Sequence, residues 1–197
     1  LKQGIDVSMI AAAGNARLMS NKETRKTAEE HYPRIKIAKI PNHETLIEDV
    51  RKSLYAAKII AYAQGFDLLK QASTAYDWNL PLGKIASIFR AGCIIQAKFL
   101  NDITRAYEHE KNLSHLLLDE VFEKRVISYE NALRQIAAQA MLSGIPVPAM
   151  ANAISYLDLF TKNHVGANLI QAQRDYFGAH TFERIDKDGS FHHEWGK

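Results

Sequence analysis

The stretch from residue 43 to residue 77 places the strongest constraint on how this chain folds. Its apolar residues recur every three or four positions, a spacing that puts them on one face of an α-helix. Small residues along it, among them Ala57 and Ala61, let a neighbouring helix approach closely. Asn42 can cap the helix start, and Glu44 suits the positive end of the helix dipole. We therefore predict one long helix that packs against other helices.

Helical spacing continues through most of the remaining sequence. Residues 33–42 are the main interruption, because Pro33 and Pro41 favour an extended connection, although the residues between them alternate as a short strand would. The 197 residues, 47% of them hydrophobic, suffice for one core. We predict an all-α domain over residues 1–178 and an extended tail over residues 179–197. Further helices are expected over residues 7–31 (one or two helices), 81–90, 93–108, 119–142, 147–161 and 167–177.

Three large aromatic residues lie in the otherwise polar tail, at Phe182, Phe191 and Trp195. Disordered tails usually lack such residues, because they have no core in which to bury them. We therefore expect the tail to dock, either on its own domain or on a second subunit.

The stretch that starts at Gly4 resembles the stretch that starts at Gly144. Self-similarity at so long a spacing is typical of a duplicated helical unit rather than of a short solenoid repeat. Chance similarity between two alanine-rich helix starts is the alternative, and we favour duplication. The chain then begins near the end of a first copy and contains a second. The shared residues are Gly4, Ile5, Val7, Ala11 and Ala13, which recur as Gly144, Ile145, Val147, Ala151 and Ala153.

Charge and composition exclude several classes of protein. The net charge of +3 is spread along the chain without a block of Lys and Arg interleaved with aromatic residues, so nucleic-acid binding is not expected. No apolar run approaches the roughly 20 residues of a membrane span, and the N-terminus does not have the pattern of a signal peptide. Cys93 is the single cysteine, which rules out an intrachain disulfide and a cysteine-based zinc site. A single cysteine also fits a reducing cytosol, and we expect a cytoplasmic protein.

Arg174, Asp175 and His180 lie close together in the sequence "QRDYFGAH", near the end of the last predicted helix. An arginine offers a planar fork of donors to a phosphate or carboxylate, and a nearby histidine can donate another hydrogen bond. Gly178 can end the helix in a left-handed conformation and let His180 point elsewhere. The alternative is structural, with Arg174 paired with Asp175 or the helix C-terminus and His180 as a turn residue. Spacing alone favours the structural interpretation.

Arg51 is a second candidate, because it lies beside the apolar face of the long predicted helix. A mid-helix arginine can hold a ligand phosphate, but more often it extends to solvent and pairs with a carboxylate such as Glu48. The sequence has no glycine-rich nucleotide loop, nucleophile elbow or zinc-binding helix motif. His192 and His193 are neighbours on an extended tail, where they point apart, so we expect no metal site there.

Three longer stretches resemble a known family. They are "LIEDVRKSLYAAKIIAYAQGFDLLKQAS", "WNLPLGKIASIFRAGCII" and "ANLIQAQRDYFGAHTFERID". They are similar to the C-terminal helical domain of the 6-phosphogluconate dehydrogenases, the decarboxylating enzymes of the pentose phosphate pathway. The similarity runs from near residue 1 to Trp195, and its closing stretch is far more specific than an all-α domain requires.

The resemblance implies a complete subunit with an N-terminal Rossmann domain that binds NADP, a duplicated all-α domain and a small C-terminal tail. Such enzymes oxidise and decarboxylate 6-phosphogluconate to ribulose 5-phosphate while NADP is reduced. This chain then supplies the second helical copy and the tail. It lacks the family's catalytic Lys and Glu, so we assign no catalytic residue here and expect the isolated chain to be inactive.

The resemblance also assigns substrate-binding residues. Arg51 matches the arginine of the family pattern "EDxRKALYASK", and Arg174 and His180 match "QRDYFGAH". In the family, the latter two reach from one subunit's tail region into the active site of the other. It follows from the resemblance that Arg51 and Arg174 hold the substrate phosphate, that His180 hydrogen-bonds the sugar acid, and that a homodimer is required.

One departure concerns the family's phosphate-binding lysine, which lies in a segment like "ERVAASK". The alignment puts Glu29 and Glu30 in its place. A carboxylate cannot hold a phosphate without a bridging cation, so either Lys36 or Lys39 serves instead or the phosphate is bound more weakly.

Two alternatives remain open. A stand-alone, catalytically inactive helical module for dimerisation or phospholigand binding would have a start codon just before Leu1, whereas an enzyme would have a nucleotide-binding motif upstream. A related β-hydroxyacid dehydrogenase is the third possibility. Its helical domain is usually not duplicated, and "QRDYFGAH" argues against it.

Overall fold

The computed structural model describes residues 2–33, 35–37 and 43–196. The predicted helix cap Asn42 and the candidate lysine Lys39 lie outside these residues. The chain divides into two compact units, Leu1–Leu157 and Asp158–Lys197. This division puts the last helix with the tail, whereas we expected that helix to belong with the all-α domain.

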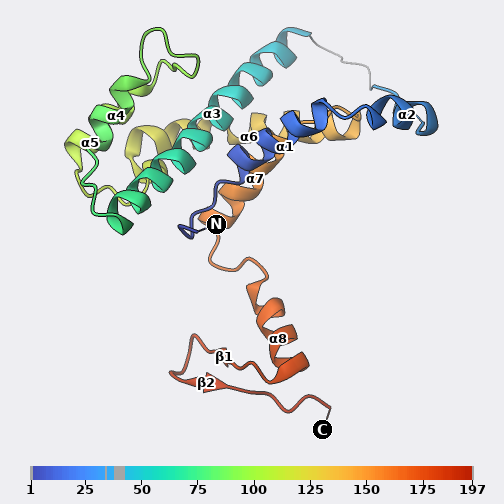
Figure 1. Ribbon diagram of the computed structural model, residues 1–197, viewed down its shortest axis with the longest axis vertical. Helices are drawn as coiled ribbons and strands as arrows, with labels where there is room; N and C mark the ends of the chain where they lie inside the picture. Colours follow the sequence, from blue (N-terminus) through green and yellow to red (C-terminus); the bar gives the residue numbers. More distant parts are fainter. Residues whose placement is uncertain (1, 34, 38–42, 197) are drawn as a thin grey trace. The chain divides into compact units, whose positions relative to one another are not determined.

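The first unit is built from helices (Figure 1). The all-α prediction is confirmed, and the helices predicted at both ends of the unit and around residues 82–88 are present. Within the described residues, the strands are β1 (Phe182–Glu183) and β2 (Ser190–Phe191) of the second unit, each two residues long. The helices are α1 (Ser8–Ser20), α2 (Thr24–His31), α3 (His43–Ala75), α4 (Leu82–Ile88), α5 (Leu100–His109), the 3₁₀-helix η1 (Leu116–Leu118), α6 (Glu120–Leu142) and α7 (Pro148–Thr161), whose last turn crosses the boundary.

The long predicted helix is α3, the central element of the first unit (Figure 1). It packs along α6, while α4 packs on α5. α6 begins at a capping carboxylate, since Asp119 Oδ1 accepts hydrogen bonds from the backbone N–H groups of Val121 and Phe122 at 3.0 and 3.3 Å. Apolar side chains of these helices and the segments beside them form one buried cluster, in which Phe66, Phe99 and Phe122 are the largest fully buried side chains.

A buried amide ties the start of α1 to α3. Gln64 Oε1 accepts a hydrogen bond from the backbone N–H of Met9 at 3.1 Å, and Gln64 Nε2 donates to Ser8 Oγ at 3.2 Å. Asp6 Oδ1 accepts from the backbone N–H of Ser8 at 2.7 Å. The first N–H groups of a helix have no acceptor within it, so the bonds to the N–H groups of Ser8 and Met9 supply partners that α1 needs.

The backbone is alike at the two stretches that resemble each other in sequence, and the duplication itself stays a prediction. Gly4 and Gly144 both adopt the left-handed conformation, with φ of 68° and 69°. Each is followed at the same interval by a helix, since α1 begins at Ser8 and α7 begins at Pro148. Matching turns at matching positions are expected of a repeated unit.

The helix predicted over residues 93–108 is wrong in its first part. α5 begins at Leu100, and the residues before it form turns. Ala91 and Gly92 have φ of 30° and 78°, values that interrupt a right-handed helix. The apolar residues that suggested a helix are instead partly in solvent, and Ile94 is 99% exposed.

The second unit has one helix, α8 (Ala167–Gly178), and a hairpin of β1 (Phe182–Glu183) and β2 (Ser190–Phe191). The strands are antiparallel and pair Phe182 with Phe191, whose ring centroids lie 6.4 Å apart. The predicted tail thus contains a short hairpin. Asp175 is the buried residue of the described part of this unit.

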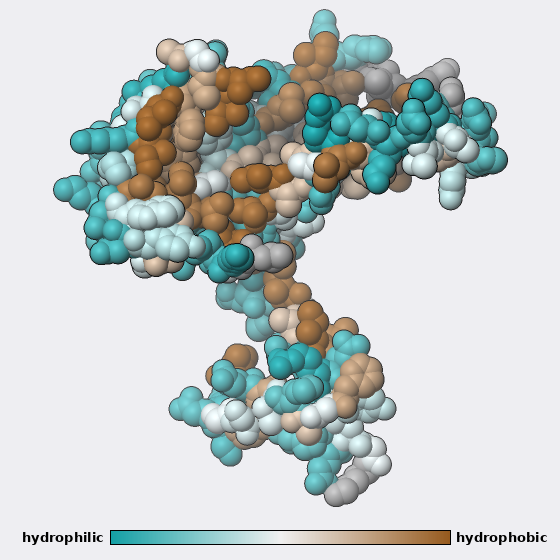
Figure 2. All heavy atoms as spheres, viewed as in Figure 1, coloured by the Kyte–Doolittle hydropathy of each residue, from teal (hydrophilic) through white to brown (hydrophobic). Residues whose placement is uncertain are grey.

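Hydrophobic side chains gather at the surface of the first unit, over α3 and the segment that follows α4 (Figure 2). A groove of about 560 Å³ lies there, with Tyr62, Phe66, Phe89 and Ile94 among its lining residues. Exposed apolar patches of this kind mark surfaces that another chain or segment covers.

None of the described helices is both long enough and apolar enough to cross a membrane.

Candidate functional site

Arg51 lies on an exposed side of α3. Its guanidinium donates two hydrogen bonds to Glu48, from Nε to Oε2 at 2.7 Å and from Nη2 to Oε1 at 2.6 Å. The hydrogen bond from Arg51 holds the pKa of Glu48 below its usual range. About half of each side chain is exposed, and ion pairs in solvent are weak. A ligand phosphate can therefore displace Glu48 from the guanidinium.

Arg51 lines a cavity of about 750 Å³ in the first unit. Three further cations, Lys58, Arg90 and Lys98, line the same cavity, and no Asp or Glu is among its described lining residues. Lys58 is tied to a second lining residue, because its Nζ donates to the backbone carbonyl of Gln96 at 2.7 Å. A concave surface lined by charges of one sign concentrates ligands of the opposite sign. The cavity therefore suits an anion.

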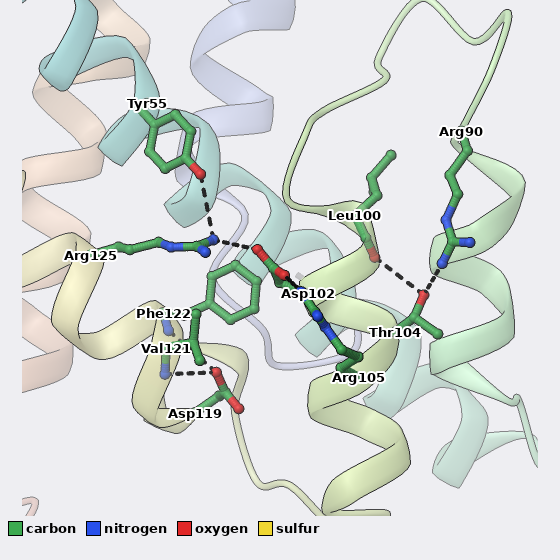
Figure 3. Close-up of polar contacts among 10 residues, drawn as sticks. All are labelled: Tyr55, Arg90, Leu100, Asp102, Thr104, Arg105, Asp119, Val121, Phe122 and Arg125. Atoms are coloured by element: carbon green, nitrogen blue, oxygen red, sulfur yellow. Dashed lines mark hydrogen bonds and ion pairs between the residues drawn. The ribbon is translucent and has the colours of Figure 1, made fainter.

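A threonine on α5 anchors the Arg90 side chain (Figure 3). Arg90 Nη2 donates to Thr104 Oγ1 at 2.5 Å, and that hydroxyl lies 3.2 Å from the carbonyl oxygen of Leu100. Arg90 Nε is buried and has no hydrogen-bond partner among the described residues. The side chain is thus fixed at one end and retains an unused donor.

An ion-pair network joins the helices beside the cavity (Figure 3). Asp102 on α5 pairs with Arg105 on the same helix and with Arg125 on α6, the latter at 2.6 Å between Oδ2 and Nη1. Arg125 Nη1 also donates to the hydroxyl of Tyr55 on α3 at 3.5 Å. Burial opposes the charge on Asp102, but the hydrogen bonds from Arg125 and Arg105 hold its pKa below the usual range. The network fixes α3, α5 and α6 around the cavity wall.

Arg174 lies exposed on α8, in the second unit. Its Nη1 donates to Gln171 Oε1 at 3.0 Å, one turn earlier on the helix. The pairing with Asp175 that the structural interpretation expected is absent from the described contacts, because the Asp175 carboxylate contacts the tail. The Arg174 side chain extends into solvent, as a residue that contacts a ligand or a second chain would.

His180 follows the end of α8 and is exposed. The left-handed residue that ends the helix is Ala179, with φ of 50° and ψ of 40°, and not Gly178 as we expected. The ring of His180 lies against Gly178. A Cβ at Gly178 would be 2.8 Å from His180 Nε2, closer than such contacts allow.

The tail docks on α8 of its own chain. Asp175 Oδ1 accepts a hydrogen bond from His192 Nδ1 at 2.8 Å, and Oδ2 accepts from Trp195 Nε1 at 2.9 Å. The Trp195 ring also packs edge-on against Tyr176, with centroids 5.8 Å apart. Docking of the same tail on a partner subunit stays a prediction.

Sequence reasoning missed three residues that the structure places at these sites, and it considered a fourth, Asp175, in a different role. Lys58 lies seven residues after Arg51, two helical turns along one face, and that spacing could have revealed it. Arg90 and Lys98 come from the turns around Gly92, for which no periodicity exists. Asp175 was considered as a partner of Arg174 alone.

The structure describes most of the residues that were compared with the family's phosphate-binding lysine. Glu29 and Glu30 lie on α2 and are exposed, and Lys36 is exposed in the segment that follows. Neither arrangement identifies a replacement for the family's phosphate-binding lysine.

Comparisons with known proteins agree with the fold. Residues 1–195 match the family model described as 6-phosphogluconate dehydrogenase, C-terminal domain. The NADP(+)-dependent, decarboxylating 6-phosphogluconate dehydrogenase of Bacillus subtilis (strain 168) is 54% identical over 156 residues, which cover 79% of this chain and 33% of that protein. The decarboxylating 6-phosphogluconate dehydrogenase of Buchnera aphidicola subsp. Schizaphis graminum is 50% identical over 192 residues, or 96% of this chain and 40% of that protein.

A solved structure is similar as well. Plasmodium falciparum 6-phosphogluconate dehydrogenase, described in its apo form and in complex with its cofactor NADP+ and its substrate 6-phosphogluconate, superimposes with a TM-score of 0.92 at 40% identity. The match covers 98% of this chain and 42% of that one. This chain therefore spans 33–42% of the length of these relatives. On this evidence, the chain belongs to the 6-phosphogluconate dehydrogenase family, of which it represents the C-terminal domain.

Proposed function

We propose that this chain works as the C-terminal part of an NADP-dependent, decarboxylating 6-phosphogluconate dehydrogenase. In that enzyme it supplies the dimer interface and the arginines and histidine that bind the substrate, while the chemistry is carried out by the part of the subunit that this chain does not include. The observation that carries the proposal is the match over residues 1–195 together with the presence of Arg51, Arg174 and His180 at exposed positions.

Arg51 is suited to the substrate phosphate. It lines a cavity whose other charged lining residues are the cations Lys58, Arg90 and Lys98. A phosphate carries up to two negative charges and can accept two parallel hydrogen bonds from one guanidinium. Against such a ligand, the exposed Glu48 carboxylate is a weak competitor for Arg51.

Arg174 and His180 are proposed to serve the active site of a partner subunit in a homodimer. Both belong to the second unit, Asp158–Lys197, which is too short to bury a core of its own. That unit also exposes large apolar side chains, among them Phe177 at 74% and Ile185 at 98%. A second subunit that covers this surface would supply the missing burial and bring Arg174 and His180 to its substrate.

NADP is assigned to the part of the enzyme outside this chain. Dinucleotides bind at the glycine-rich turn between a parallel strand and a helix. The strands that the structure describes, β1 and β2, are two residues long and antiparallel, and the sequence has no such glycine-rich motif. The described residues therefore do not form a dinucleotide site.

With its single cysteine, Cys93, the protein is proposed to be cytoplasmic.

The test measures 6-phosphogluconate-dependent NADPH formation by the full-length protein that carries this chain. In the Arg174→Ala variant, the KM for 6-phosphogluconate should rise about tenfold to a hundredfold, since a charge-assisted hydrogen bond contributes about 1.5–3 kcal/mol. The KM for NADP should stay unchanged, and the isolated 197-residue chain should show no activity.

Three results would contradict parts of the proposal. Absence of activity in a folded full-length protein would favour the inactive helical module, and activity in the isolated chain would show that the catalytic residues lie within it. An unaltered KM for 6-phosphogluconate in Arg174→Ala would show that Arg174 is structural.

A further inference from the structure

Asp175 is buried where its neighbours are not. Its side chain is fully shielded from solvent, whereas Arg174 and Tyr176 beside it on α8 are exposed. Burial of a carboxylate is costly unless hydrogen bonds replace the lost water. The substrate contacts proposed above do not involve Asp175, so its burial needs another explanation.

Four donors converge on the Asp175 carboxylate. Oδ1 accepts from the backbone N–H of Thr181 at 3.1 Å and from His192 Nδ1 at 2.8 Å. Oδ2 accepts from the backbone N–H of His193 and from Trp195 Nε1, both at 2.9 Å. Burial opposes the charged form, but these hydrogen bonds outweigh it and hold the pKa of Asp175 below its usual range. The carboxylate is therefore ionised at neutral pH, and His192 Nδ1 is the donor in their contact.

The same residue fixes the backbone on both sides of His180. The carbonyl oxygen of Asp175 accepts from the N–H of Ala179 at 2.8 Å, and its side chain accepts from the N–H of Thr181. Ala179 and Thr181 both have positive φ, 50° and 61°, although neither is glycine. Such conformations are unfavourable for side-chain-bearing residues and persist only when other contacts impose them. The hydrogen bond from Thr181 to the Asp175 side chain is a contact of this kind, whereas the bond from Ala179 to the Asp175 carbonyl is the backbone bond of a helix end and does not depend on the side chain.

The tail adds a second constraint to the same point. His192, His193 and Trp195 reach Asp175 from beyond the hairpin, so one carboxylate joins α8, the turn that bears His180 and the last residues of the chain. A side chain that only anchored the tail would not need to contact the turn. Contact with both turn and tail holds the orientation of His180 relative to α8.

We propose that Asp175 is the positioning residue for His180, and that the tail segment 192–195 completes its hydrogen-bond set. Asp175 does not touch the substrate. It holds the strained turn 179–181 in the conformation that sets the direction of the His180 ring, which lies against Gly178. This inference rests on the proposed role of His180 in substrate binding.

The first test replaces Asp175 with asparagine in the full-length enzyme. The Asp175→Asn side chain would keep the shape but present an N–H₂ group to two of the four donors, so the turn should loosen. We expect the KM for 6-phosphogluconate to rise about tenfold, as expected when a binding group is displaced rather than removed, while the KM for NADP stays within about twofold. Asp186→Asn is the matched control, because Asp186 lies in the same unit, is exposed and pairs with Arg184 alone among its described side-chain partners.

A second pair of variants guards against misfolding of the first. His192→Ala removes one donor and should raise the KM for 6-phosphogluconate in the same direction, whereas His192→Asn places an amide N–H near the position of Nδ1 and should restore it. Amide hydrogen exchange gives an independent readout. The N–H groups of Thr181 and His193 should exchange faster in Asp175→Asn and in His192→Ala, while those in the middle of α8 stay protected.

The outcomes separate this inference from the proposed function. A raised KM together with faster exchange at Thr181 supports it. Unchanged KM in Asp175→Asn, with Arg174→Ala and His180→Ala still raising it, would overturn the positioning role and leave the proposed function intact. Unchanged exchange at Thr181 and His193 would also overturn it. If Arg174→Ala and His180→Ala leave the KM unchanged, the proposed function fails and this inference fails with it.

Discussion

The two units of this chain are organised by different chemistry. In Leu1–Leu157, apolar side chains from α3, α5, α6 and the neighbouring segments form one buried cluster. In Asp158–Lys197, the described residues bury no large apolar side chain, and Asp175 with its four donors takes the central place. Apolar burial contributes most of the stability of a fold, whereas hydrogen bonds contribute little net stability but require one arrangement. Apolar burial thus accounts for most of the stability of the first unit, whereas hydrogen bonds define the conformation of the second.

A unit that lacks an apolar core of its own depends for its stability on packing against another surface. Leu169, Tyr176 and Phe177 on α8 are all more than half exposed. Exposed apolar residues at such density mark an interaction surface. We therefore expect substitutions in the first unit to change its stability. Substitutions in the second unit should change the geometry of the turn that bears His180 and the binding of 6-phosphogluconate.

The largest effect is expected in the apolar cluster. Phe122 is fully buried and packs edge-on against Phe99, with centroids 6.0 Å apart. Phe122→Ala should lower the free energy of unfolding of the first unit by about 3–5 kcal/mol, because it removes a large buried ring and leaves a cavity. Amide exchange should show faster opening in α3 and α6. Equal loss of protection at Thr181 would contradict the separation of the two units.

The next largest effect is expected in the ion pairs of the first unit, which should contribute less to its free energy of unfolding than apolar burial does. Arg125→Ala leaves Asp102, whose side chain is 13% exposed, without its α6 partner, and should cost about 1–3 kcal/mol of unfolding free energy. Arg105→Ala is the matched control. Arg105 pairs with the same carboxylate but is 74% exposed, so its loss should cost less than about 1 kcal/mol. Chemical denaturation of both variants checks the order, and a reversed order would show that solvent exposure does not govern these pairs.

Acid should weaken the two units in different pH ranges. In the first unit, His115 Nδ1 accepts from the backbone N–H of Leu117 at 3.2 Å, so the neutral ring carries its proton on Nε2, 2.8 Å from the hydroxyl oxygen of Tyr156. Burial lowers the pKa of His115. A histidine with a lowered folded pKa contributes stability when neutral, which is lost as the pH falls below about 6.5. Asp175, with its lowered pKa, contributes stability that is lost only below about pH 4.

The pH prediction is checked by unfolding the protein between about pH 7.5 and about pH 5, a range that spans the ordinary pKa of histidine. Stability of the first unit should fall over this range, and the fall should be shallower in His115→Phe, which cannot titrate. Protection of the Thr181 amide should not change over the same range. An identical slope in His115→Phe would remove His115 as the cause.

The smallest effect concerns backbone strain in the second unit. Ala179 ends α8 in the left-handed conformation, which glycine adopts without penalty. Ala179→Gly should change the unfolding free energy by less than about 1 kcal/mol, because relief of strain is offset by the greater entropy of the unfolded chain. The KM for 6-phosphogluconate should rise, because glycine loosens the turn that holds His180. A large loss of stability would instead show that the second unit depends on local backbone preference.

Much of the fold could be predicted from periodicity, and the two misses have different causes. α3, α6, α7 and α8 follow apolar spacing that continues over at least three turns. The segment before Leu100 failed, because Ala91 and Gly92 break the helix while apolar residues such as Ile94 continue past them. The hairpin was missed, because two-residue strands are too short to show an alternating pattern.

The candidate site was less accessible to local reasoning. Spacing alone favoured a structural interpretation of Arg174 and His180, and only the resemblance assigned them a proposed binding role. Asp175 had no local pattern at all, since its donors come from Thr181 and from residues 192–195 beyond a hairpin. A hydrogen-bond centre assembled from distant parts of the chain is recognisable only after the fold is known.

Mixed dimers show whether Arg174 reaches the substrate site of the partner subunit, as proposed above. Full-length Arg51→Ala and Arg174→Ala subunits are each expected to be weakly active at low 6-phosphogluconate. When they are dissociated, mixed in equal amounts and reassociated, about half of the dimers combine one subunit of each kind. If the sites are shared, one site in each mixed dimer has both arginines intact, and about a quarter of the wild-type activity should return. No recovery, with mixed dimers present, would show that Arg51 and Arg174 act within one subunit and would contradict the account.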